Sequence, residues 1–128
     1  MVTSRSRLPD SIPSLDAHVV TQLREVMEDD FVDLLQTYLV SVPNELNRLT
    51  AAMANRDVEG IVGSSHAVKG SSANIGALRL SELCKTMERM GREKRIDADA
   101  DTLLQAIFDE FSRVKPLIEQ WIRNASAS

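Results

Sequence analysis

A long stripe of apolar residues between Phe31 and Met53 constrains the fold of this chain more than any other feature. Its members recur at the i, i+3, i+4 spacing of one helix face: Phe31, Leu34, Leu35, Tyr38, Leu39, Val42, Leu46, Leu49 and Met53. This spacing predicts a long amphipathic helix. Pro43 lies inside the stripe, and because the pattern resumes after it we expect a kink there rather than an end. Such a helix must bury its apolar face against other elements.

Shorter apolar stripes predict four more helices. One starts at Leu15 and ends near Glu28, one runs from about 58 to 74, one lies around 80–87, and the last lies around 103–121. Asp57 is a plausible N-cap of the helix from 58, and Pro116 should bend the last helix near Ser112. Gly91 and the following run EKRIDADAD are expected to form a polar connection. No segment shows the alternation of a strand. Five helices joined by short turns favour an all-α fold, an antiparallel helical bundle.

Length and composition fit this architecture. The chain has 128 residues, enough for one domain, and only 4% aromatic residues, so the core must be built from aliphatic side chains and Met. We expect a flexible tail or linker at 1–14, the domain at 15–124 and a disordered C-terminus at 125–128. The net charge of −4 argues against a nucleic-acid partner.

Cys84 is the single cysteine, so no internal disulfide is expected, and its place on an apolar stripe favours a buried core residue. No apolar run approaches the length that spans a bilayer, and the N-terminus lacks the apolar stretch of a signal peptide. We therefore expect a monomeric cytoplasmic protein that does not insert into a membrane.

The stretch HAVKGSSANIGA, from His66 to Ala77, is the part of the sequence that stability does not explain. An interior helical glycine costs about 1 kcal/mol relative to alanine, yet Gly63 and Gly70 lie one turn to either side of His66. They leave a bare approach to the ring for a large partner. Lys69, three residues after His66, lies on the same helix surface.

These residues suit phosphoryl transfer. A histidine that is mostly neutral near pH 7 offers a ring-nitrogen lone pair that can attack phosphorus. The product carries about two negative charges, part of which Lys69 can neutralise. Transfer through a loose transition state needs in-line access and charge stabilisation, which the glycines and the lysine provide.

The span from His66 to Ala77, with Leu80, Leu83, Cys84 and Met87 after it, resembles the histidine phosphotransfer (HPt) domain family, whose motif is approximately H-x-x-K-G-x-[SA]-x-x-x-G-[AL]. The resemblance extends from Leu15 to the final helix. It implies an all-α fold, an antiparallel four-helix bundle with an additional short N-terminal helix. It also implies that His66 accepts the phosphoryl group, that Lys69 and Gly70 are the motif's lysine and glycine, and that Gly76 ends the helix.

The same resemblance implies a phosphorelay intermediate of two-component signalling. Such a domain takes a phosphoryl group from an aspartate of a receiver domain, in a response regulator or a hybrid sensor kinase, and passes it to another receiver. The receiver supplies magnesium and most catalytic groups, so this chain is expected to be a carrier rather than an enzyme, with no cofactor or metal of its own.

Glu88 lies outside the motif. If the two helices around Gly76 form an antiparallel hairpin, Glu88 is level with His66, each about 16 Å from the turn. Related domains often carry a neutral glutamine at this place, so a glutamate is a departure. We hypothesise that its carboxylate orients the His66 ring by bonding one nitrogen. The alternative is a solvated charge on the rim of the helix.

Other readings of the same residues stay open at this point. The chain could be a helical interaction module that docks receiver or kinase domains without carrying phosphate. A hydrolase using Cys84 and His66 would need an exposed thiol near the imidazole. A metal site has little support, because the two histidines, His18 and His66, lack further ligands at the usual spacing. His18 itself is expected on the surface of the first helix.

Overall fold

The apolar stripe forms α2 (Phe31–Ala54) in the computed structural model, which describes residues 11–126. The helix continues through Pro43, as predicted. Its inward face is buried along its whole length by Phe31, Leu35, Tyr38, Val42, Leu46, Leu49 and Met53. Tyr38 places its hydroxyl 2.7 Å from the Ser72 hydroxyl, so this buried polar group keeps a hydrogen-bond partner.

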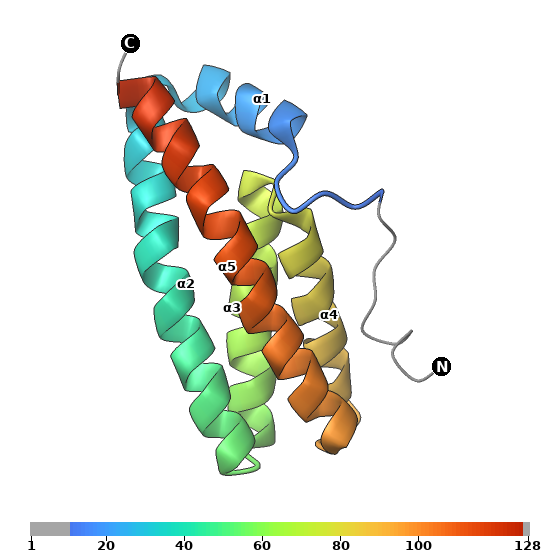
Figure 1. Ribbon diagram of the computed structural model, residues 1–128. Coiled ribbons are helices and arrows are strands. Elements are labelled where there is room, and N and C mark those ends of the chain that lie inside the picture. The colour runs from blue at the N-terminus through green and yellow to red at the C-terminus, as the bar shows by residue number, and fades with distance from the viewer. Residues whose placement is uncertain (1–10, 127–128) are drawn as a thin grey trace.

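The remaining elements complete an all-α bundle (Figure 1). They are α1 (Ala17–Met27), the short 3-10 turn η2 (Glu28–Asp30), α3 (Val58–Ile75), α4 (Leu78–Arg92) and α5 (Ala98–Ser126). Helices α2 to α5 lie alongside one another, and α1 crosses one end of them. Helix α3 packs mainly on α4 and α2, and α5 closes the bundle against the same two helices. The predicted fold class is confirmed.

Two caps fix the ends of α3, the helix that carries His66. The Asp57 carboxylate accepts a hydrogen bond of 3.0 Å from the Gly60 backbone N–H, which confirms the predicted N-cap. Gly76 follows the helix with φ +89°, a left-handed conformation that favours glycine. The Gly76 carbonyl also holds the N-terminal segment at this turn, because it accepts a hydrogen bond of 2.8 Å from the Asp16 N–H.

The prediction of a polar connection at 91–101 was wrong at both ends. Gly91 is buried in the last turn of α4, where an added Cβ would lie 2.9 Å from Val62 Cγ2 and 3.1 Å from Ile61 Cγ2. The glycine therefore lets α4 approach α3 closely. Helix α5 begins at Ala98, because the Asp97 carboxylate accepts from two backbone N–H groups at its start.

Both expected chain ends also differ from the structure where it describes them. Helix α5 runs to Ser126, beyond the predicted limit of 124, while residues 127–128 lie outside the described part. Residues 11–14 were expected in the tail, yet the Ile12 and Pro13 carbonyls accept hydrogen bonds of 3.1 and 3.2 Å from Arg79. Residues 1–10 lie outside the described part. Among the described residues, no helix has the length and apolar content to cross a bilayer.

Candidate functional site

His66 lies on the outward face of α3 with 64% of its side chain exposed. The expected bare approach is present on both sides of the ring. A Cβ added at Gly63 or at Gly70 would meet no heavy atom within 4 Å outside its own helix backbone. A partner can therefore approach the ring across a surface without large side chains at these two positions.

Glu88 lies level with His66 on α4, as the hairpin register predicted. The Glu88 Oε2 atom is 3.1 Å from His66 Nδ1, and the Glu88 side chain is only 7% exposed. The alternative of a solvated rim charge is wrong. The contact exists because α3 and α4 pack closely, with Ser81 also donating from α4 to the Lys69 carbonyl at 2.9 Å.

The Glu88 carboxylate is held in its charged form. Burial raises its pKa, but hydrogen bonds from Lys69, Arg92 and His66 outweigh this effect and lower the pKa of Glu88 to about 2. An ionised carboxylate can only accept hydrogen bonds, so His66 Nδ1 must carry a proton to donate. The proton on Nδ1 leaves the lone pair of the neutral ring on Nε2.

Lys69 is bound to the same carboxylate, which the sequence pattern did not indicate. Its Nζ atom is 2.7 Å from Glu88 Oε1, and 31% of its side chain is exposed. The positive charge of Lys69 is therefore near the ring, as expected, but the carboxylate balances it. A Lys69–Glu88 pair alone would leave the surroundings of His66 without net charge.

Arg92 is the residue of this site that sequence reasoning missed. Its Nη2 atom is 2.6 Å from Glu88 Oε2, the oxygen that also faces His66. With Lys69 and Arg92 against one carboxylate, the groups around the neutral ring carry a net charge of +1. The signal was available in the i, i+4 spacing from Glu88 to Arg92, which places both on one helix surface.

The other residues considered from the sequence lie apart from this cluster. Cys84 is fully buried, and burial raises the pKa of its thiol to about 12, so the hydrolase reading is wrong. His18 is exposed on α1, as predicted. Gly76 lies at the α3–α4 turn, where an added Cβ would contact Val19 at 3.1 Å. Among the described residues, no three His, Cys, Asp or Glu side chains form a metal-binding group.

Comparison with known proteins agrees with this geometry. The family model of the Hpt domain matches residues 33–126, which include α3 and α4. The match therefore covers the whole His66 cluster, by which we mean His66, Lys69, Glu88 and Arg92. The chain belongs to the Hpt domain family. As an Hpt domain, it is a phosphotransfer intermediate of two-component phosphorelays, and its family is one of phosphoryl carriers whose partners are receiver domains.

Two solved structures resemble this Hpt domain. The crystal structure of histidine-containing phosphotransfer protein B (HptB) from Pseudomonas aeruginosa PAO1 superposes with a TM-score of 0.84 at 33% identity, over 88% of this chain and 96% of that one. The Hpt domain of a sensor hybrid histidine kinase from Shewanella gives a TM-score of 0.72 at 17% identity, over 87% and 95% of the two chains. The second likeness concerns the fold alone.

Curated relatives place a similar domain inside much larger proteins. The signal transduction histidine-protein kinase BarA of Shigella flexneri is 29% identical over 82 residues, and that of Escherichia coli K12 is 28% identical over the same length. The matched segment is 64% of this chain but only 9% of either kinase.

Proposed function

We propose that Nε2 of His66 accepts a phosphoryl group from the aspartyl phosphate of one receiver domain and passes it to the aspartate of another. The observation that carries this proposal is the exposed ring, bonded through Nδ1 to a buried carboxylate and flanked by glycines. That arrangement leaves one unprotonated nitrogen facing solvent, which is what an in-line attack requires.

The exchange balances without a further reactant. The Nε2 lone pair forms the P–N bond while the P–O bond to the aspartate breaks, and the aspartate leaves as a carboxylate. Glu88 positions the ring and holds the proton on Nδ1. Lys69 and Arg92 offset the Glu88 charge and leave the net positive charge that favours the phosphorylated ring. In-line transfer to the second receiver reverses these steps.

The partner supplies the rest of the chemistry in this proposal. The receiver holds the magnesium ion and most catalytic groups, so the chain acts as a carrier that is not an enzyme in its own right, with no cofactor of its own. A monomeric state in the cytoplasm, where a reduced Cys84 would persist, belongs to the same proposal.

Incubation with phosphorylated receivers tests the function directly. Each receiver domain encoded by the source genome is phosphorylated with acetyl phosphate and Mg²⁺, freed of phosphodonor and mixed with the chain. Transfer should appear as label that is stable in base and lost in acid, as a phosphoramidate requires. Absence of such label with every receiver, together with no phosphohistidine after treatment with phosphoramidate, would refute the proposal.

Substitution at Gly70 should separate access from stability. Gly70→Ala is expected to stabilise the domain by up to about 1 kcal/mol, because the added Cβ meets nothing and a helical glycine is removed. Gly70→Gln should slow transfer at least about tenfold by obstructing the approach to the ring. Ser112→Gln, which adds the same side chain to the exposed side of α5, should transfer normally. Unimpaired transfer by Gly70→Gln would contradict the access argument.

A further inference from the structure

The outward surface of α4 carries a positive charge that the His66 cluster does not use. The helix has four Lys or Arg residues and two Glu residues, within a chain whose net charge is −4. Arg79 pairs with Glu110 and Arg92 with Glu88, while Lys85 and Arg89 are exposed and form no ion pair with another described residue. Two uncompensated cations therefore remain on this helix, with the half-buried Glu82 as its other carboxylate.

The register between α3 and α4 places these cations beside the approach to the ring. Glu88 faces His66, and Gly91 packs against Ile61 and Val62. Lys85, one turn from Glu88 toward the α3–α4 turn, is consequently level with the Gly70 end of the bare surface. Arg89 follows Glu88 directly on the outward side. We name Lys85 and Arg89 the α4 rim.

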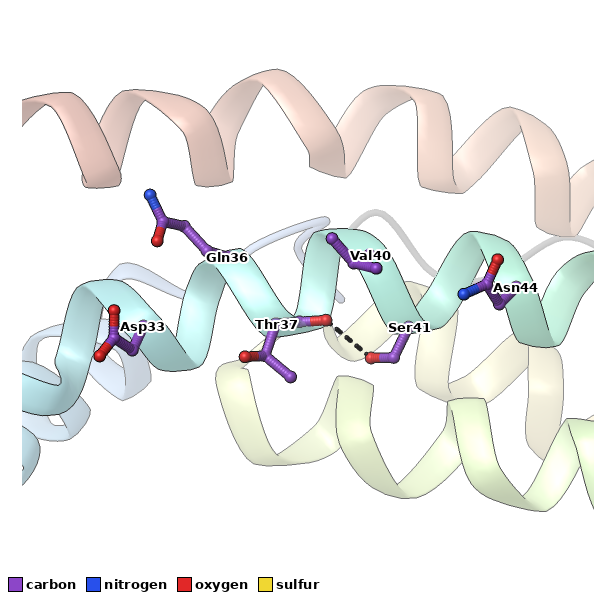
Figure 2. Close-up of a pocket in the computed structure, with 6 residues that line it drawn as sticks. All are labelled: Asp33, Gln36, Thr37, Val40, Ser41 and Asn44. Atoms are coloured by element: carbon purple, nitrogen blue, oxygen red, sulfur yellow. Dashed lines mark hydrogen bonds between the residues drawn. The ribbon is translucent and has the colours of Figure 1, made fainter.

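The outward face of α2 has a different character. Helix α2 presents a pocket on its outward face, lined by Asp33, Gln36, Thr37, Val40, Ser41 and Asn44 (Figure 2). Asp33 is the one charged residue of this lining, and Val40 is 67% exposed. Figure 2 shows that Asp33 and Asn44 lie at opposite ends of the lining. The outward face of α2 at this pocket thus carries one acidic and otherwise neutral side chains, whereas the outward face of α4 carries two cations without an ion-pair partner among the described residues.

We propose that the α4 rim is an electrostatic docking surface for the acidic face of the receiver domain, and that it orients the partner over His66. The inference rests on the proposed function. A receiver that uses an aspartate and holds Mg²⁺ through carboxylates is acidic around its reacting group. Complementary charge accelerates encounter and favours the orientation in which the acidic face of the receiver lies over the α4 rim rather than over the α2 pocket, where Asp33 would repel it.

Lys85 and Arg89 form no hydrogen bond or ion pair with His66 or Glu88, which are all within the described part of the chain, so the rim should affect association rather than the transfer step. The double variant Lys85→Gln/Arg89→Gln should lower the second-order rate constant of transfer about tenfold at low ionic strength. The difference should disappear near 1 M salt, where the Debye length is about 3 Å. The transfer rate at saturating receiver should stay unchanged.

A matched control removes the same charge elsewhere. Lys115→Gln/Arg123→Gln alters two exposed cations of α5 and should keep the wild-type salt dependence. The probe is the acetyl-phosphate-treated receiver that transfers to the wild-type chain. Two outcomes would overturn the docking role of the α4 rim. One is an equal dependence of the transfer rate constant on salt in the wild type and the Lys85/Arg89 variant, and the other is an equal loss of rate in the α5 control. In either case wild-type transfer would leave the proposed function intact, whereas a wild-type chain that no receiver phosphorylates would overturn both.

Discussion

Replacing His66 with Gln is expected to abolish phosphoryl transfer while leaving the helical fold intact. Glutamine has no nitrogen lone pair that can attack phosphorus, so no residual labelling should remain. The His66 side chain is 64% exposed and its side-chain hydrogen bond is to Glu88, so the stability change should stay within about 1 kcal/mol. Labelling by a phosphorylated receiver measures the first effect, and urea unfolding followed by circular dichroism measures the second.

His18→Gln is the matched control, because it removes the other histidine of the chain from an exposed position on α1. This variant should be labelled at the wild-type rate. Label that persists in His66→Gln, or that disappears in His18→Gln, would contradict the assignment of the phosphoacceptor.

Truncation of Glu88 should produce the second largest loss. Glu88→Ala removes the acceptor that lies 3.1 Å from Nδ1, so the ring can rotate and the proton can move to Nε2. By analogy with carboxylates that orient metal-bound histidines, transfer should slow about 10- to 100-fold. Glu88→Gln keeps a carbonyl oxygen that can accept the hydrogen bond from Nδ1, so this variant should retain most of the wild-type transfer rate. If Glu88→Ala transfers normally, the positioning role is wrong.

The pH dependence of unfolding gives a second measure of Glu88. Its pKa falls from an ordinary value of 4.5 to about 2 in the folded chain, so the carboxylate stabilises the fold above about pH 4.5. This contribution is lost as the pH falls toward 2. Between pH 5 and 2 the wild-type unfolding free energy should fall by up to about 3 kcal/mol more than that of Glu88→Gln. Parallel pH profiles in urea unfolding would refute this ion cluster.

The sequence determined the elements whose signals are local. Each helix follows from apolar spacing along its own segment, and Asp57 and Gly76 mark the ends of α3 because capping depends on backbone geometry within a few residues. The exposed position of His66 and the level of Glu88 also followed, since a helical hairpin has a fixed rise per residue. The same local reasoning was wrong about Gly91. A glycine followed by polar residues indicated a loop, but Gly91 lies in α4 and allows close packing against α3.

Only the tertiary structure decided how the charges of the site are shared. Helical spacing shows that Lys69 lies near His66 and Arg92 near Glu88, but not that both cations bind one buried carboxylate. That arrangement depends on the distance between α3 and α4, which buried glycine and aliphatic side chains set. Burial also removes water from the Glu88 carboxylate, so its charge has to be stabilised by hydrogen bonds and cations from the protein. Periodicity along one helix carries no information about the separation of two, so the sequence alone could not supply the ion cluster.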